Sequence, residues 1–582
     1  MINLLNAIFI IMGLCFLPFS VVFAAADTLL INGKIITVNK GFDVVTSVAI
    51  KDGKFIAVGA TAQILPLSDE KTTVIDLKGK TVVPGFIDGH AHMDREGLKY
   101  IPTSLDGAHS IKDILSIIEQ EVKTKKPGEW IVTMPMGDYP YYGIRADFLK
   151  EGRFPTRHDL DKVAPNNPVY IKSPWYYWTG VAPIISIANS AALKLAGINK
   201  DTKVPHPGMT IQRDENGEAT GIFEENGPIG SVEHSLMKVV PRFTHQDRVT
   251  ALKKSMALYN SEGTTSVYEG HGVSPEVIAA YDELHRKGAL TVRSHLVISP
   301  TWDKGSNQNL LQKWSDLAGG KGYGDDFLKY SGIYTEVGGT PQDTVRRNNS
   351  DYSGWGGQSV DGALPEDRGD LNELVMAATL HDLRVNAITY SEASLKEHLV
   401  AFEAASQKTP IKDKRYIIEH LSFVNDEQLE KIKQLGLIAT VLPGSMIWLN
   451  GLSRTKNLTA EKANQYVPLQ SFVDNDIPFV IGTDNVPFAP LHSIGAAVTR
   501  LDATTGQVSS PDQRITREEA LKAFTINGAY LSFEENIKGS IEVGKLADLV
   551  VLSEDYMTVD AENIRNIKVL MTLVGGKVVF EK

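Results

Sequence analysis

The middle of the chain alternates β-rich runs with helical segments, and this alternation restricts the fold more than any other feature of the sequence. Such an order is typical of a parallel sheet whose helices lie outside it. Eight β-rich runs can be counted, at 85–92, 264–269, 291–298, 330–337, 384–390, 415–421, 437–442 and 478–483. Eight such units predict an α/β fold built on a (β/α)₈ TIM-like barrel.

The two ends of the chain are also β-rich. Asn32-Gly33 and Asp52-Gly53 each lie between two β-rich runs, which is a strong indication of hairpins. Similar runs recur near the C-terminus, so we expect both ends to form one small β-sandwich domain. The first gap in the barrel is too long for a simple crossover and predicts a large insertion after strand 1. The predicted parts are a β-sandwich from 27–83 and 535–582, a barrel over 84–534, and an insertion at about 98–260.

The first two dozen residues differ from the rest. The segment 8–23 is almost wholly apolar and is followed by the small residues Ala24, Ala25 and Ala26, a pattern typical of a signal peptide. We therefore expect a signal peptide over 1–26 and an exported protein, periplasmic or secreted. An uncleaved segment that anchors the chain in a membrane is the alternative, because its length approaches that needed to span.

Composition excludes some classes of function. The 582 residues carry a formal net charge of −11, and no basic run appears, so a nucleic-acid partner is not expected. The only cysteine, Cys15, lies inside the predicted signal segment. The mature protein would therefore have neither a disulfide nor a thiolate ligand for a metal.

Three predicted strands end in residues that can bind a metal. His90 and His92 are two residues apart, so both imidazoles would point to the same side of the strand and could reach one ion. His420 and Asp484 end two further strands. Each residue alone fits a strand end satisfied by a loop. Together, at the end of a barrel where enzymes of this fold keep their sites, they favour a metal centre.

Several of these motifs carry a resemblance to a known family. The chain resembles the amidohydrolase superfamily at 82–92, His420, 482–484 and 539–550, and its YtcJ-like branch, which includes N-substituted formamide deformylases, at 189–193, 220–225 and 263–267. The resemblance spans nearly all of 27–582. It implies an enzyme that hydrolyses a non-peptide, amide-type carbon–nitrogen bond through a metal-activated water.

The resemblance also implies a set of ligands. The family scheme has HxH on strand 1, a carboxylated lysine or a glutamate on strand 4, a histidine on strands 5 and 6, and an aspartate on strand 8. His90, His92, His420 and Asp484 match this scheme. Two positions depart from it, because Tyr334 stands at the strand 4 position and Asn386 at the strand 5 histidine. Glu336 lies on the same face as Tyr334 and could supply the missing carboxylate.

These departures favour one divalent ion, zinc, over two. His90, His92 and Asp484 would hold the ion, with water completing its shell. Asp484 would also take a proton from that water, while His420 would be a fourth ligand or would polarise the substrate carbonyl. Tyr334 could donate a hydrogen bond to a developing oxyanion. Other side chains could compensate for the lost ligands, although a surface or loop position is the simpler interpretation for each: Glu225, Glu269, His271 and His295.

The sequence gives few indications of the substrate. Tyr352 and Trp355 follow strand 4, where a loop over the barrel mouth would lie, and 175–178 could add an aromatic wall; a place in the core suits these aromatic residues equally. Asn386, a poor ligand for zinc, is assigned to substrate contact. The expected substrate is a small apolar or aryl amide. Hydrolysis of an ester, lactone or carbamate, and an inactive binding or regulatory protein, remain as alternatives.

Overall fold

The computed structural model describes residues 25–143, 145–227, 229–299, 307–337, 345, 352, 354–355 and 371–582. The predicted signal segment lies outside the described residues up to position 24. In the part of the chain that is described, no helix has the length and apolar character needed to cross a membrane.

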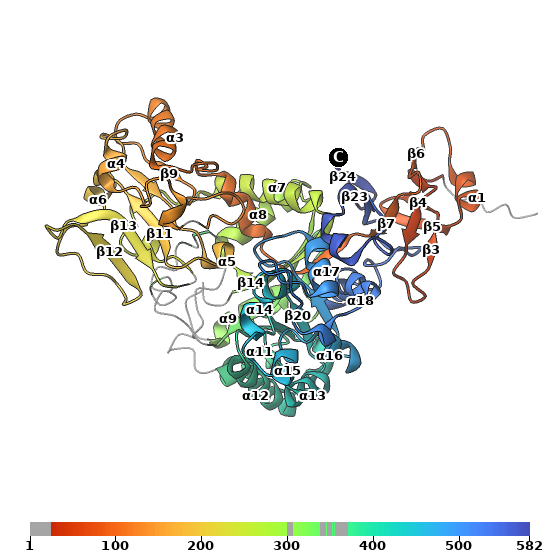
Figure 1. Ribbon diagram of the computed structural model, residues 1–582. Helices are drawn as coiled ribbons and strands as arrows, with labels where there is room; N and C mark the ends of the chain where they lie inside the picture. Colours follow the sequence, from red (N-terminus) through yellow and green to blue (C-terminus); the bar gives the residue numbers. More distant parts are fainter. Residues whose placement is uncertain are drawn as a thin grey trace, which may run out of the picture.

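Eight parallel strands form the central barrel, and each falls within, or overlaps, one of the predicted β-rich runs (Figure 1). In their hydrogen-bonded order they are β8 (Phe86–Ala91), β14 (Thr264–Val273), β15 (Arg293–Ile298), β17 (Leu328–Glu336), β18 (Val385–Ile388), β19 (Ile417–Glu419), β20 (Ile438–Val441) and β21 (Phe479–Ile481). The predicted α/β barrel is therefore confirmed.

Helices cover the outside of the barrel, and their apolar faces pack on its strands in one large core. The longer ones are α7 (His245–Ser261), α8 (Pro275–Arg286), α9 (Asn307–Ala318), α11 (Leu371–Leu380), α12 (Glu392–Lys408), α13 (Asp426–Leu435) and α17 (Pro490–Thr499), with the shorter α14 (Gly451–Thr455), α15 (Ala460–Asn464), α16 (Leu469–Asp474), α18 (Arg517–Ala523) and α19 (Ile526–Leu531). The barrel interior is filled by side chains that include Tyr268, Tyr334 and Ile388.

The barrel closes between β8 and β21, which are not joined by a continuous ladder. The backbone N–H of Asp484 donates to the carbonyl of His90 at 2.8 Å. Below this contact, Asp88 accepts hydrogen bonds from the backbone N–H and the hydroxyl of Thr483 at 3.0 and 2.5 Å. A Cβ at Gly482 would lie 2.6 Å from Cβ of His90, so only glycine permits this approach. Closure thus brings two of the predicted site residues side by side.

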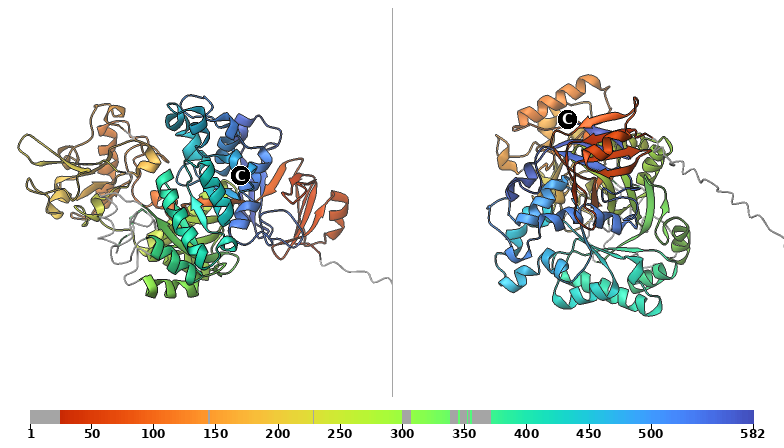
Figure 2. Two further views of the ribbon diagram at one scale, coloured as in Figure 1. Left: turned by 90° about the horizontal axis from the view of Figure 1, so that it is seen from below. Right: turned by 90° about the vertical axis from the view of Figure 1, so that its right-hand side faces the viewer.

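Strands from both ends of the chain form two sheets beside the barrel (Figure 2). The first sheet contains β5 (Lys54–Gly59), β4 (Ser47–Lys51), β1 (Thr28–Ile31) and β6 (Thr73–Asp76), and the second contains β24 (Lys577–Glu581), β23 (Val569–Val574), β22 (Leu549–Leu552), β7 (Thr81–Pro84), β2 (Lys34–Ile36) and β3 (Val44–Val45). The two ends meet where β22 pairs antiparallel with β7. Because β8 follows β7 directly, this pairing fixes the start of the barrel.

The long segment after β8 contains a separate five-stranded sheet, which lies on the other side of the barrel (Figures 1 and 2). Its strands are β12 (Met209–Arg213), β13 (Ala219–Glu225), β11 (Ile184–Ala188), β10 (Val169–Ile171) and β9 (Ile131–Thr133), with α3 (Ile111–Thr124), α4 (Arg157–Asp161) and α6 (Ser190–Leu195) packed around them. The short helix α5 (Tyr176–Thr179) carries side chains from this segment to the barrel mouth. Helix α7 falls in the range predicted for the insertion but packs against α8 and β14 of the barrel.

A buried ion-pair network holds three barrel strands together. Glu534 lies 3.0 Å from His295 Nε2 on β15 and 2.6 Å from Lys538 Nζ, and it also pairs with Lys329 on β17. Lys538 in turn donates to the hydroxyl of Ser266 on β14. Burial alone would raise the pKa of Glu534, but Lys538 and His295 outweigh it and hold that pKa far below its ordinary value of 4.5.

Replacing this carboxylate should therefore destabilise the barrel. Glu534→Gln leaves the buried Lys538 ammonium and the partly exposed Lys329 ammonium without their counter-ion. We expect a loss of about 3–5 kcal/mol in the free energy of unfolding, measured by urea denaturation at pH 7. A carboxylate whose pKa is lowered by folding stabilises the folded state fully at a pH above its pKa in the unfolded chain. The stability difference between wild type and Glu534→Gln should therefore shrink as the pH falls below 4.5. Glu535→Gln, which removes a partly exposed pair with Arg415, is the control and should cost less than about 1 kcal/mol. Equal losses in both variants would contradict the role of Glu534.

Candidate metal centre

Four imidazoles meet at the C-terminal end of the barrel strands. His90 is the second-last residue of β8, His92 follows that strand, His271 lies near the end of β14, and His420 follows β19. The ring centroids of His90 lie 5.2, 4.8 and 4.7 Å from those of His92, His271 and His420. All four side chains are buried. A Cβ at Gly270 would lie 2.3 Å from the His90 ring, so this glycine lets β14 bring His271 against it.

The ring nitrogens converge on one small region. Nε2 of His420 lies 3.2 Å from Nε2 of His90 and 3.1 Å from Nε2 of His271. Nε2 of His92 lies 3.0 Å from Oδ1 of Asp484. Ligand atoms of His90, His420 and Asp484 all lie within 4.8 Å of one another, as do those of His90, His92 and His271.

Burial keeps these imidazoles neutral. It lowers the pKa of His90 to about 4 and that of His420 to about 3, and it lowers the pKa of His92 and His271 well below 6.5. The guanidinium of Arg95, which contacts Nδ1 of His92, also lowers the pKa of His92. A neutral imidazole has one nitrogen lone pair free to bind a metal.

The donor set fits a divalent ion. His420 Nε2 faces two other Nε2 atoms, and a neutral ring with a single N–H cannot satisfy both contacts by hydrogen bonding. Two nitrogen ligands that each lie about 2.0–2.1 Å from a tetrahedral zinc are about 3.3 Å apart. The distances between the Nε2 atoms of these rings are close to that value. Neutral imidazoles at this spacing, with a carboxylate beside them, are the ligands that zinc takes in proteins.

A buried carboxylate supports the cluster from behind. Oε2 of Glu419 lies 3.0 Å from Nδ1 of His90. Burial raises the pKa of Glu419 well above 4.5, and the charge of Arg384 opposes that shift only in part. A carboxyl group close to Nδ1 leaves Nε2 of His90 to face the other imidazoles, a position that outer partners of metal-bound histidines commonly take.

Two residues of the site have unusual backbone conformations. His420 has φ of 70° and Asp484 has φ of 59°, both in the left-handed region that residues other than glycine rarely adopt. Such conformations cost free energy and persist where the surrounding structure imposes them, often at functional sites. They turn both side chains at the strand ends towards the other imidazoles.

A second group with metal-ligand spacing adjoins the first and contains His92, Asp94 and Glu269. Burial, followed by the charge of Asp94, raises the pKa of Glu269 well above 4.5. The hydroxyl of Tyr281 donates to Glu269 at 2.5 Å. Arg95 Nε lies 3.5 Å from Asp94 Oδ1, so a fixed positive charge already lies at this group.

Tyr334 and Glu336 contact each other. The Tyr334 hydroxyl donates to Glu336, and the buried Tyr334 ring lies 5.9 Å from that of His271. Within the described residues, none of the groups with metal-ligand spacing includes Glu336. The Tyr334 hydroxyl, expected to donate to an oxyanion, thus donates to the neighbouring Glu336 carboxylate.

Asn386 is also used within the barrel. Its side chain accepts a hydrogen bond from the Tyr268 hydroxyl at 2.7 Å and donates to the carbonyl of Ile333 at 3.1 Å. It is fully buried and does not line the cleft described below. At the position where the family scheme has the strand 5 histidine, Asn386 therefore makes hydrogen bonds within the barrel core.

The four residues that could compensate for lost ligands lie in different environments. They are at most 5% exposed, so the expectation of surface or loop positions is wrong for each of Glu225, Glu269, His271 and His295. His271 joins the cluster, whereas His295 pairs with Glu534 and Glu225 accepts hydrogen bonds from Ser231 in the insertion. The sequence did contain an indication for His271, since it lies between two glycines at the end of a β-rich run.

A cleft of about 870 Å³ opens above the imidazoles, and His420 and Asp484 line its floor. This volume is in the range of small-molecule sites. Tyr176, Tyr177 and Trp178 of α5 form one wall. The indole N–H of Trp178 donates to Asn485, whose amide donates to Asp484 at 2.6 Å. The wall and the floor are therefore joined directly.

The other aromatic residues proposed for the substrate lie behind this wall. Trp355 packs against Trp178 with ring centroids 5.3 Å apart, and its indole N–H donates to the Ser173 carbonyl. Tyr352 stacks on His234 at 5.5 Å. Neither residue lines the cleft, so Trp355 acts as support for Trp178.

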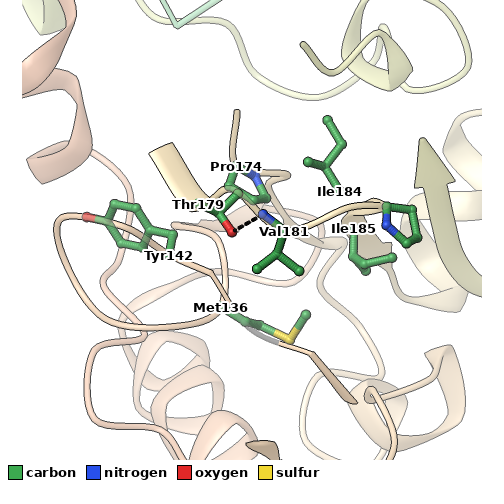
Figure 3. Close-up of a pocket in the computed structure, with 8 residues that line it drawn as sticks. Met136, Tyr142, Pro174, Thr179, Val181, Ile184 and Ile185 are labelled. Atoms are coloured by element: carbon green, nitrogen blue, oxygen red, sulfur yellow. Dashed lines mark hydrogen bonds between the residues drawn. The ribbon is translucent and has the colours of Figure 1, made fainter. Parts of the chain in front are cut away.

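A second, much smaller pocket lies behind α5 (Figure 3). Met136, Tyr142 and Ile185 line it, and it shares Thr179 with the cleft. The backbone N–H of Val181 donates to the Thr179 hydroxyl at 3.1 Å. Its volume of about 20 Å³ has room for roughly one water molecule, so the substrate belongs in the larger cleft.

Comparison with known proteins identifies the family. A model of the amidohydrolase family matches residues 73–580, and the chain belongs to this family. Protein LONG AFTER FAR-RED 3 of Arabidopsis thaliana is 28% identical over 575 residues, covering 95% of this chain and 91% of that protein. N-substituted formamide deformylase of Arthrobacter pascens is 26% identical over 568 residues, covering 96% and 98%.

A solved structure shares the fold. The crystal structure of an uncharacterized metal-dependent hydrolase from Pyrococcus furiosus has a TM-score of 0.67 and 24% identity, and the match covers 91% of this chain and all of that one. The predicted place in the amidohydrolase superfamily, in its YtcJ-like branch, is confirmed by the sequence relatives. Family membership and the metal-spaced histidines also confirm the predicted class of function, a metal-dependent hydrolase.

Proposed function

We propose that this protein hydrolyses an amide-type carbon–nitrogen bond of a small apolar or aryl amide, with one zinc ion at the imidazole cluster. The observation that supports the proposal is the convergence of four neutral imidazoles and Asp484, two of which, His420 and Asp484, line an open cleft. The deformylase relative acts, by its name, on N-substituted formamides, which contain such a bond.

The predicted ligands His90, His92 and Asp484 would be joined by His271 and His420. Two of the groups with metal-ligand spacing contain them, namely His90 with His92 and His271, and His90 with His420 and Asp484. A bound divalent ion supplies a Lewis acid, which lowers the pKa of a bound water and polarises a carbonyl oxygen. One ion is favoured over two because Arg95 already places a positive charge at the neighbouring acidic group. A second cation there would be repelled by the guanidinium.

Asp484 is the proposed general base. Its carboxylate lies at the cleft floor, held by the Asn485 amide at 2.6 Å and 3.0 Å from His92 Nε2. It would take a proton from the attacking water and deliver it to the leaving amine, so that water and amide become acid and amine. The aromatic wall of α5 favours an apolar or aryl body next to the scissile bond.

Removal of this base should abolish turnover. For Asp484→Asn we expect kcat to fall by about 10²–10⁴-fold on N-formyl and N-acetyl aryl amines, with the circular dichroism spectrum and zinc content measured in the same samples. Asp476→Asn, which changes an exposed carboxylate, is the control. Full activity of Asp484→Asn would exclude its role. Faster hydrolysis of aryl esters, lactones or carbamates than of amides would favour the alternative bond class. Absence of turnover with every metal tested would favour a binding or regulatory protein.

The metal proposal is tested by composition. Purified protein should contain about one zinc per chain by plasma mass spectrometry, and His271→Asn should weaken zinc binding at least about tenfold in competition with a chromophoric chelator. The visible spectrum of the cobalt-substituted protein should change in the same variant. His109→Asn, at an exposed position, should leave both unchanged. Two ions per chain, or an unaltered cobalt spectrum in His271→Asn, would contradict the single site with His271 as ligand.

We further propose that the chain is exported and cleaved after Ala24. Ala26 is buried, its backbone N–H donates to the Leu67 carbonyl, and its own carbonyl accepts from the Thr72 hydroxyl. Because Ala26 makes these contacts with the folded protein, we place the cleavage before it. Expression of the full chain in a Gram-negative host should give a periplasmic protein whose mass and N-terminal sequence begin at Ala25. Recovery of the uncleaved chain in the cytoplasm or the membrane fraction would oppose this proposal.

A further inference from the structure

The cleft has an uneven distribution of charge. Besides Asp484, two charged side chains line it, Glu392 and Arg454. Glu392 is neutralised by Lys462, whose Nζ lies 2.6 Å from Oε2 of Glu392. Arg454 forms no ion pair with any carboxylate in the described part of the chain, although its side chain is exposed to the cleft. Among the described residues, the Arg454 guanidinium of the cleft therefore has no carboxylate partner.

Arg454 and the imidazoles line the cleft from different segments. Arg454 belongs to α14, in the segment that follows β20. The Leu452 N–H and the Thr455 hydroxyl of α14 contact Asp502 and Ser509, at 3.2 and 3.3 Å. None of the four imidazoles comes from this segment.

Much of the remaining cleft lining is apolar or aromatic. Tyr466 packs against Phe423 with ring centroids 5.0 Å apart, and Tyr390 lies 5.3 Å from the His420 ring. The Tyr466 hydroxyl donates to the Met446 carbonyl at 3.0 Å, and Leu442 and Met446 also line the cleft. A ligand that spans from His420 to Arg454 would thus contact imidazole at one end, aromatic and aliphatic carbon in the middle, and a guanidinium at the other.

We propose that the substrate carries an anionic group, a carboxylate or its equivalent, at the end remote from the bond that is cleaved, and that Arg454 binds this group. The position of the cleaved bond rests on the function proposed above. A guanidinium presents paired N–H donors that match a planar carboxylate.

Charge complementarity supports an anion over a neutral group. The chain as a whole has a formal charge of −11 and would repel an anionic ligand. An unpaired cation inside the cleft offsets that repulsion locally. A neutral substrate would make no use of Arg454, and a cationic one would be repelled by it.

The test compares two probes that differ only in this charge. Binding of 4-acetamidobenzoate and of its neutral carboxamide, 4-acetamidobenzamide, is measured by isothermal titration calorimetry with the metal-loaded full-length mature protein. The wild type should bind the carboxylate about fivefold more tightly, a modest factor because Arg454 is exposed to water. The preference should decrease at 0.5 M salt, which screens the charge.

Two variants locate the contact. Arg454→Gln should abolish the preference for the carboxylate, whereas Lys456→Gln, which removes an exposed charge two residues away and outside the cleft lining, should retain it. Equal binding of the two probes by the wild type, no binding of either, or a preference that survives in Arg454→Gln overturns the proposal.

Hydrolysis of the same probes is followed separately by release of the aryl amine. A preference that depends on Arg454 without any hydrolysis supports the anion contact and counts against the proposed bond specificity. Hydrolysis of both probes with equal affinity overturns the anion contact and leaves the proposed function in place.

Discussion

The contact between β8 and β21 is the constraint on which the rest of the site depends. The hydrogen bond from the Asp484 N–H to the His90 carbonyl closes the barrel and places the carboxylate beside the imidazoles. Asp88 reinforces it through Thr483, and burial raises the pKa of Asp88 to about 6. Because Gly482 permits the close approach, a side chain there would separate the two strands and move Asp484 away from His92. The geometry of the metal centre is thus a direct consequence of barrel closure.

Desolvation determines the chemistry of the cluster. Four imidazoles in one buried region cannot all be positively charged, because burial and their mutual repulsion penalise the charged form. Each neutral ring has one nitrogen lone pair at neutral pH, without any rearrangement. The charge of Arg95 further disfavours a positive charge on His92, and the Glu419 carboxyl lies 3.0 Å from Nδ1 of His90. Burial at the barrel end therefore keeps the rings in the form that binds a metal.

The fold could be predicted from the sequence because its eight strands are continuous apolar runs separated by helices, a pattern with few alternatives. His90, His92, His420 and Asp484 could be predicted for the same reason, since strand ends of one barrel meet. His271 did not stand out among the possible compensating residues, because β14 is irregular after Glu269 and its register there does not follow from spacing. The environments of Tyr334 and Asn386 depend on Glu336 and Tyr268, and the sequence does not show which core partner satisfies a polar side chain.

Tyr334 and Asn386 are informative because, relative to the family scheme, they alter both the packing of the barrel core and the set of metal ligands. Where the family scheme would have ligands on strands 4 and 5, this barrel has a tyrosine–glutamate pair and an asparagine bound to Tyr268. A ligand set without those strands must lie towards β8, β14, β19 and β21, where His271 adds the nitrogen that the other side lacks. The residues that would hold the ion therefore belong to one side of the barrel. Asp484 and His420, which belong to that side, are the site residues that face the cleft, so a substrate would approach between α5 and the segment after β20. With that approach, the far end of the substrate would lie near Arg454, so the proposed anion contact is consistent with the side on which the ligands lie.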